Sequence, residues 1–186
     1  LGESYDVVDF YGAGYGYQSA LNPEMLDYLG NICDEIVDQF PSISGLSERP
    51  KILDIGSNDG SLIEMLAREG FDCHGIDPSA GRFENRYQKI SAKLDVDFFP
   101  SGLKAVHKFD CISAIAMFYD TPEPRRFLEA VVENLVHGGV FVVDVGFVPV
   151  MLSNGALDSV CHEHLTYYDL PQLVSLFDAV GLEITK

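Results

Sequence analysis

The stretch Leu53-Asp54-Ile55-Gly56-Ser57-Asn58-Asp59-Gly60 decides how this sequence is interpreted. It continues a short apolar strand signal that begins at Lys51, and it precedes residues 61–67, whose apolar side chains share one helical face. The stretch is therefore a strand, a glycine-bearing turn and a helix start. Such a turn presents backbone N–H groups at the positive end of a helix. Gly56 allows a ligand to approach the backbone closely.

The chemistry of this turn narrows the class of ligand. It has no Lys after Gly60, so it is not a P-loop for triphosphates. Its G-x-x-x-G spacing differs from the G-x-G-x-x-G of dinucleotide sites, and Asp54 and Asp59 would repel phosphates. S-adenosylmethionine, which has an amine, ribose hydroxyls and no phosphate, fits the turn better. A plain strand-to-helix turn without a ligand is the alternative interpretation.

A second acidic position supports the ligand interpretation. Residues 71–77 are expected to form a strand that ends in Asp77. An acidic residue about 20 residues past a glycine turn can accept hydrogen bonds from both ribose hydroxyls. The alternative is that Asp77, Pro78 and Ser79 only begin the next helix, because Asp and Ser favour capping positions.

Composition excludes several classes of function. The chain has 186 residues, of which 47% are hydrophobic, so it suits one domain, or one domain with an extension. Its net charge of −17 argues against a nucleic acid or an anionic membrane as partner. No apolar run has the length of a membrane span, and no signal peptide is recognised. Because the first residue is Leu, the sequence is interpreted as an excised fragment.

The cysteines predict a reduced, cytoplasmic setting. Cys33, Cys73, Cys111 and Cys161 contain no C-x-x-C pair, which argues against a zinc knuckle. No metal site is therefore predicted.

Read from its first residue to its last, the sequence predicts two regions, residues 1–50 and residues 51–186. Residues 1–50 are expected to form a Gly/Tyr-rich arm, which acts either as a flexible extension or as a lid, and a helix from Asn22 to about Phe40. Residues 51–186 alternate strands and helices. Strands are expected at 51–55, 71–77, 94–99, 109–117, 140–145 and from 182, and helices at 61–69, 79–90, 123–136 and 171–180, with an irregular stretch over 146–169.

This alternation is typical of an α/β fold. We expect a doubly wound, mostly parallel Rossmann-like sheet with helices on both faces and an N-terminal helical arm, truncated within its sixth strand. Ligands of such sheets bind at the carboxyl ends of the strands. The glycine turn, Asp77, the loop at 117–119 and the stretch after Val145 all lie at that edge.

Four segments carry a resemblance to a known family: residues 17–22, the glycine turn through Gly60, Ala116-Met117-Phe118-Tyr119-Asp120, and Cys161-His162-Glu163-His164-Leu165-Thr166-Tyr167-Tyr168. The chain resembles class I S-adenosylmethionine-dependent methyltransferases. Within them it is similar to sugar C-methyltransferases that act on nucleotide-linked 4-keto-deoxysugars. The last segment is the most specific. That family usually has a cysteine-rich zinc module before this region and a further domain after it, so the chain resembles its central cofactor domain.

The resemblance and the turn together predict the site. The expected cofactor-binding residues are Asp54, Gly56, Ser57, Asn58, Asp59, Gly60, Asp77, Pro78, Ala116, Met117 and Phe118. The resemblance implies that Glu163 and His164 face the substrate and that Tyr17 covers the cofactor. It also implies that the nucleotide half of the substrate contacts the flanking domains, because Lys and Arg are scarce here.

Carbon methylation needs a base, because a C–H bond has no lone pair. His164 is the expected base, Glu163 would orient it or bind a sugar hydroxyl, and Tyr17 would donate a hydrogen bond to the oxyanion. The alternative for His164 is packing alone.

Three other functions remain open: an O- or N-methyltransferase, a metal-binding or regulatory module, and a nicotinamide-binding domain. For the second, the C-H-x-H spacing of 161–164 is too compressed for a usual zinc finger. The glycine spacing disfavours the third.

Overall fold

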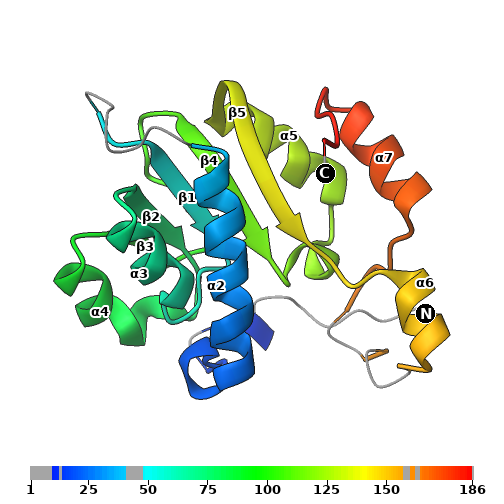
Figure 1. Cartoon of the computed structure of the whole chain (residues 1–186), viewed down its shortest axis with the longest axis horizontal. Coiled ribbons are helices and arrows are strands. Elements are labelled where there is room, and N and C mark those ends of the chain that lie inside the picture. The colour runs from blue at the N-terminus through cyan, green and yellow to red at the C-terminus, as the bar shows by residue number, and fades with distance from the viewer. Residues whose placement is uncertain (1–9, 13, 41–47, 157–159, 162–163, 186) are drawn as a thin grey trace.

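The computed structural model describes residues 10–12, 14–40, 48–156, 160–161 and 164–185. Its centre is one parallel sheet of five strands in the order β3-β2-β1-β4-β5 (Figure 1). The strands are β1 (Lys51–Ile55), β2 (Asp72–Ile76), β3 (Lys93–Asp95), β4 (Phe109–Ile115) and β5 (Leu135–Asp144). Strand order reverses between β1 and β4, which opens a crevice at their carboxyl ends. The predicted doubly wound α/β fold is confirmed.

Helices cover both faces of this sheet. On one face lie α2 (Pro23–Asp38), α3 (Ser61–Arg68) and α4 (Glu84–Lys89), which pack on apolar strand residues such as Ile52. On the other face lie α5 (Pro124–Asn134) and α7 (Leu170–Asp178), which pack on residues such as Leu53 (Figure 1). Successive residues of β1 thus point to opposite layers, as strand geometry requires.

Helix α2 forms as the sequence predicts. The Asn22 side chain accepts hydrogen bonds from the N–H groups of Glu24 and Met25, at 3.0 and 3.3 Å. Its buried residues, Leu29, Cys33 and Ile36, recur at helical spacing. Short 3-10 segments precede α2 (η1, Ser19–Leu21), precede α4 (η3, Ala80–Phe83) and follow β4 (η4, Phe118–Asp120).

Four predicted boundaries are wrong. Strand β3 ends at Asp95 rather than at 99, because the chain turns into a loop. Helix α5 ends at Asn134, and β5 begins at once at Leu135, with a register shift against β4. The stretch 146–169 is not irregular throughout: it contains α6 (Val148–Asn154), whose C-cap is Gly155. Residues 182–185 form no strand, because no described strand lies beside them.

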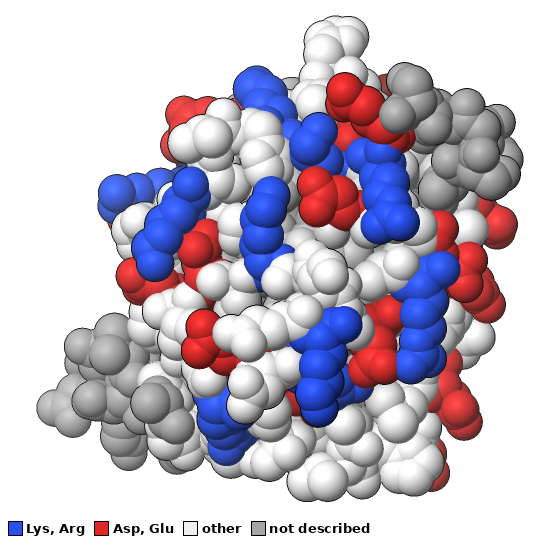
Figure 2. Space-filling model, turned by 90° about the vertical axis from the view of Figure 1, so that its left-hand side faces the viewer, with Lys and Arg blue, Asp and Glu red and all other residues white. Residues whose placement is uncertain are grey.

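Charge is distributed unevenly along the chain. Nine of the twelve Lys and Arg residues lie between positions 49 and 108, whereas the first 48 residues contain none. On the face that carries α3, α4 and β3, basic side chains lie among acidic ones (Figure 2). In the part of the chain that the structure describes, no helix is both long enough and apolar enough to cross a membrane.

Candidate functional site

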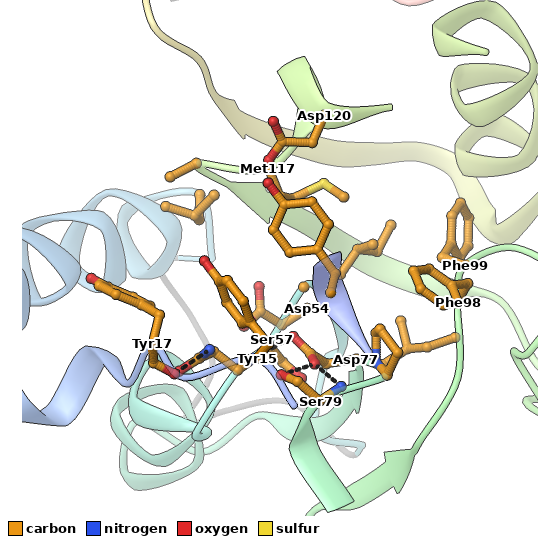
Figure 3. Close-up of a pocket in the computed structure, with 18 of the residues that line it drawn as sticks. Tyr15, Tyr17, Asp54, Ser57, Asp77, Ser79, Phe98, Phe99, Met117 and Asp120 are labelled. Carbon is orange, nitrogen blue, oxygen red and sulfur yellow. Dashed lines mark hydrogen bonds between the residues drawn. The ribbon is translucent and has the colours of Figure 1, made fainter. Parts of the chain in front are cut away.

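A cavity of about 380 Å³ lies at the carboxyl ends of β1 and β4 (Figure 3). Its size is within the range of small-molecule sites. One part of its wall, which we call the turn side, comes from strand ends: Asp54, Gly56, Ser57, Asn58, Asp77, Pro78 and Ser79. A second part, which we call the arm side, consists of Tyr15, Tyr17, Tyr119 and His164. The loop after β4 also contributes Ala116 and Met117.

The glycine turn is held in left-handed conformations that its residue types allow. Gly56 has a φ of +73°, and a Cβ at this position would lie 3.1 Å from Cγ of Met117. Asn58 has a φ of +49°, which Asn tolerates better than most residues. The N–H of Asn58 donates to Oδ2 of Asp77 at 2.9 Å. The turn after β1 is thereby joined to the end of β2.

Asp77 lines the cavity directly after β2. Its Oδ1 accepts hydrogen bonds from the backbone N–H and the hydroxyl of Ser79, each at 2.6 Å. The side chain is buried, yet it belongs to the cavity wall. The segment η3 begins after Ser79, whose side chain makes no capping hydrogen bond, so Asp77 closes a local turn rather than capping a helix. A carboxylate has about four acceptor positions, and Asn58 and Ser79 occupy three of those of Asp77, so one remains for a ligand hydroxyl.

Asp54 is a buried acid on the turn side. The hydroxyl of Ser113 donates to its Oδ1 at 2.7 Å. Burial raises the pKa of Asp54 to about 7; the Ser113 hydrogen bond opposes this shift, and the charge of Asp77 adds to it. A carboxyl group with a pKa near neutrality becomes ionised when a cation binds beside it.

Two residues of the predicted site, Asp59 and Gly60, do not line the cavity. Asp59 is 1% exposed, and its carboxylate accepts hydrogen bonds from the N–H of Ala20 at 2.7 Å and from the Ser61 hydroxyl at 2.6 Å. Gly60, the N-cap of α3, has a φ of +78°, and a Cβ there would lie 2.9 Å from the ring of Tyr87. Both residues hold the turn and the arm in position.

Tyr87 also contacts the turn on a second side. Its hydroxyl donates to Oγ of Ser57 at 2.9 Å, and a Cβ at Gly75 would lie 2.7 Å from its ring. The fully buried ring therefore lies between Gly60 and Gly75.

Phe118 is the third predicted residue that does not line the cavity. It is fully buried and stacks on Tyr168, with ring centroids 5.4 Å apart. It belongs to the core beneath α5 and α7.

The arm is attached to the turn side by backbone groups. The Asn58 side chain donates to the carbonyl oxygen of Tyr17 at 3.2 Å and accepts from the N–H of Ser19 at 3.3 Å. Arg82 donates to the same Tyr17 oxygen at 3.1 Å. The rings of Tyr15 and Tyr17, whose centroids are 6.4 Å apart, are thereby held at the cavity.

His164 lies on the arm side against Tyr119, with ring centroids 4.3 Å apart. The N–H groups of Leu165 and Thr166 donate to the Tyr119 carbonyl at 3.1 and 3.0 Å, which fixes the segment after His164. Burial, with added effects from nearby charges including Asp120, raises the pKa of Tyr119, so its hydroxyl remains a proton donor. Glu163 and His162 lie outside the described residues.

Sequence reasoning missed one wall of the cavity. Asp97, Phe98 and Phe99 follow β3 and line the cavity, and Figure 3 shows Phe98 and Phe99 on the same side of it as Asp77. The sequence predicts that they belong to the strand itself, at 94–99. The signal that could have identified them is an acidic residue and two aromatic residues at the end of a strand, the edge where ligands bind.

The residue types fit S-adenosylmethionine. Asp77 can accept from ribose hydroxyls, Asp54 can face a cation, and Phe98 and Phe99 offer aromatic surface to a base. None of the described lining residues is Lys or Arg. The described residues also contain no group of three or more His, Cys, Asp or Glu side chains suited to a metal.

Comparison with known proteins agrees with this fit. Residues 25–186 match the family described as "Methyltransferase domain". "C-methyltransferase NovU" of Streptomyces niveus is 23% identical over 179 residues, which are 91% of this chain and 40% of that protein. A "Ubiquinone biosynthesis O-methyltransferase" of Psychrobacter cryohalolentis is 31% identical over 101 residues, or 50% of this chain and 39% of that protein. The chain thus spans well under two thirds of these two relatives.

Solved structures share the fold. "Magnesium protoporphyrin IX methyltransferase (ChlM)" from Synechocystis PCC 6803, with bound SAM, has a TM-score of 0.62 at 12% identity, covering 87% of this chain and 70% of that one. The YcgJ protein of Bacillus subtilis has a TM-score of 0.63 at 17% identity, covering 83% and 68%. Fold, cavity and family match lead to one conclusion: the chain belongs to the methyltransferase domain family.

Proposed function

We propose that this chain is the cofactor-binding part of an enzyme that methylates a carbon atom of a nucleotide-linked 4-keto-deoxysugar. The observation that carries the proposal is His164 on the cavity wall, with its ring 4.3 Å from that of Tyr119. The 161–168 segment and the similarity to NovU support methylation at carbon. The cofactor-binding residues are Asp54, Gly56, Ser57, Asn58, Asp77, Pro78, Ala116 and Met117, with Asp59, Gly60 and Phe118 supporting them from behind.

The reaction begins with removal of a proton beside the ketone. An imidazole nitrogen of His164 takes this proton, and the electron pair moves onto the ketone oxygen to give an enolate. Tyr17 donates a hydrogen bond to that oxygen, and Glu163 orients His164. The bound cofactor would supply a methyl group on a sulfonium, to which the enolate carbon would form the new C–C bond as the C–S bond breaks.

The charge of the cavity constrains which part of the substrate enters it. Four of its lining residues are carboxylic acids, Asp54, Asp77, Asp97 and Asp120, and no described lining residue is a cation. A diphosphate would be repelled there. The uncharged keto-sugar therefore enters the cavity, and the nucleotide diphosphate is bound by flanking parts of the protein.

The test uses the full-length enzyme with S-adenosylmethionine and a nucleotide-linked 4-keto-deoxysugar. His164→Asn should lower the rate by roughly 10²–10⁴-fold, the usual contribution of a general base, and should stop exchange of the substrate α-proton with deuterated solvent. The control is His137→Asn, at an exposed position in β5.

Two results would contradict the proposal. One is α-proton exchange at the wild-type rate in His164→Asn. The other is a product whose new methyl group lies on oxygen or nitrogen, as determined by NMR, which would identify an O- or N-methyltransferase instead.

A further inference from the structure

Asp95, at the end of β3, is a buried acid that the reaction above does not use. Its Oδ2 lies 2.9 Å from Nε2 of His74 on β2, and the two side chains are 7% and 6% exposed. The same Oδ2 accepts a hydrogen bond from the backbone N–H of Lys104 at 2.9 Å. Asp95 and Lys104 bracket residues 96–103, so one carboxylate joins the two ends of this loop.

The loop 96–103 is compact. The N–H of Gly102 donates to the carbonyl of Phe98 at 2.8 Å, and a Cβ at Gly102 would lie 2.2 Å from Cβ of Asp97. Phe99 packs edge-on against Phe127 of α5, with ring centroids 5.2 Å apart. A loop closed in this way places its cavity-lining residues, Asp97 to Phe99, as a unit.

Asp95 also holds Asp77, the acid at the end of the neighbouring strand β2. Its carbonyl oxygen accepts the N–H of Asp77 at 3.1 Å. Asp77 is the acid that we assign to the ribose hydroxyls. A shift of Asp95 would therefore move the ribose acid relative to Phe98 and Phe99, which are labelled together with Asp77 in Figure 3.

His74 acts on Asp95 as a neutral donor. Nε2 is the ring nitrogen that faces the carboxylate, whereas Nδ1 is buried without a hydrogen-bond partner among the described residues. An N–H at Nδ1 would be an unsatisfied buried donor, and burial lowers the pKa of His74. The ring also lies edge-on to Phe109, with centroids 5.9 Å apart, which restricts its rotation.

We propose that Asp95, held by His74, is a positioning residue that sets the loop 96–103 against the base of the cofactor and thereby determines selectivity for adenine. Asp97 supplies a carboxylate at that wall, and the exocyclic amine is the hydrogen-bond donor of an adenine base. A hypoxanthine base has a carbonyl in its place, which a carboxylate would repel. The inference rests on assigning this cavity to the cofactor.

The test measures binding of S-adenosylhomocysteine and of S-inosylhomocysteine by calorimetry. His74→Phe removes the donor to Asp95 and should weaken S-adenosylhomocysteine binding by roughly tenfold, the scale of one hydrogen bond to a charged group. It should also reduce the preference for adenine over hypoxanthine. His74→Gln, whose amide can occupy the Nε2 position, should restore both quantities to within about threefold of the wild type.

A matched control separates positioning from loss of stability. Leu66→Ala truncates a fully buried residue of α3 that does not line the cavity, so it destabilises the fold without changing the base preference. If His74→Phe lowers both affinities equally, or if His74→Gln behaves like His74→Phe, the positioning role is wrong. Wild-type protein that binds neither compound would instead overturn the assignment of the cavity to the cofactor.

Discussion

The turn side and the arm side of the cavity are built in different ways. On the turn side, Asp54 and Asp77 are less than 10% exposed, and each accepts a hydrogen bond of 2.9 Å or less from a neighbouring strand or turn. On the arm side, Tyr17 is 41% exposed and is held through its own backbone carbonyl. The turn side is part of the sheet, whereas the arm side is brought to it by peripheral segments.

This difference predicts how each side responds to change. Groups buried among strand ends cannot relax without disturbing the core, so their loss should cost affinity or stability directly. Groups held by a few partly exposed hydrogen bonds can open locally at small cost. Substitutions on the two sides should therefore differ in size and in kind.

The largest effect is expected at Gly60. Gly60→Ala places a side chain in a left-handed conformation and against the Tyr87 ring, so the free energy of unfolding should fall by about 2–4 kcal/mol. Gly138→Ala is the matched control, because its φ is similar, at +76°, with no atom within 4 Å of the added Cβ. Urea unfolding of both variants measures the difference. Equal losses of unfolding free energy in the two variants would mean that contact with Tyr87 adds nothing to the cost of Gly60→Ala.

Asp77→Ala should give the next largest effect. Loss of hydrogen bonds to a charged group weakens S-adenosylmethionine binding by about 1.5–3 kcal/mol. Asp72→Ala changes an acid at the opposite end of β2 and should leave affinity unchanged. Calorimetry on folded variants is the measurement, and an unaltered affinity in Asp77→Ala would remove this residue from the site.

Asp54 should make cofactor binding depend on pH. Its pKa of about 7 in the native state exceeds the ordinary 3.8, so this group lowers the free energy of unfolding as pH rises from about 4 to 7. Ionised Asp54 favours a sulfonium cation. The affinity for S-adenosylmethionine should therefore increase severalfold between about pH 6 and 8, and less so in Asp54→Asn. An identical pH profile in Asp54→Asn would contradict this role.

The smallest effect on affinity is expected from Asn58→Gly, which tests the arm. Glycine keeps the left-handed turn and removes only the amide that bonds to Tyr17 and Ser19. Amides of residues 15–21 should exchange with solvent about tenfold faster, the value of one hydrogen bond. Cofactor affinity should change by less than about threefold. A large loss of cofactor affinity with unchanged amide exchange would mean that Asn58 acts on the cofactor and does not hold the arm.

Local signals in the sequence predicted the strands that carry the turn side. The turn after β1 and the end of β2 are predictable from neighbouring residues: each strand is an apolar run, Gly56 permits the positive φ of the turn, and Asp77 follows the end of β2. Helix α2 was equally predictable, because its cap and its first proline adjoin in the sequence at Asn22 and Pro23.

The remaining features depend on contacts between distant segments. Gly138 has the positive φ of a helix end, yet it lies in the register shift at the start of β5, which only pairing with β4 reveals. Asp59 looked like a ligand residue, but its partners are Ala20 and Ser61. Helix α6 has signals of its own in the sequence, Pro149 near its start and Gly155 after its end, but they were not recognised among the apolar residues around them.

The position of Tyr87 between two glycines has a consequence for how the sequence can evolve. Gly75 has no special backbone conformation, so Gly75→Ala is excluded only by Tyr87 and by Ser57, whose Oγ would lie 2.6 Å from the new Cβ. Smaller residues at positions 57 and 87 would make room for alanine at position 75. Gly60 has no such escape, because its φ of +78° persists whatever residue occupies position 87. Positions 57, 75 and 87 can therefore vary together, whereas alanine at position 60 would remain strained whatever residue occupies position 87.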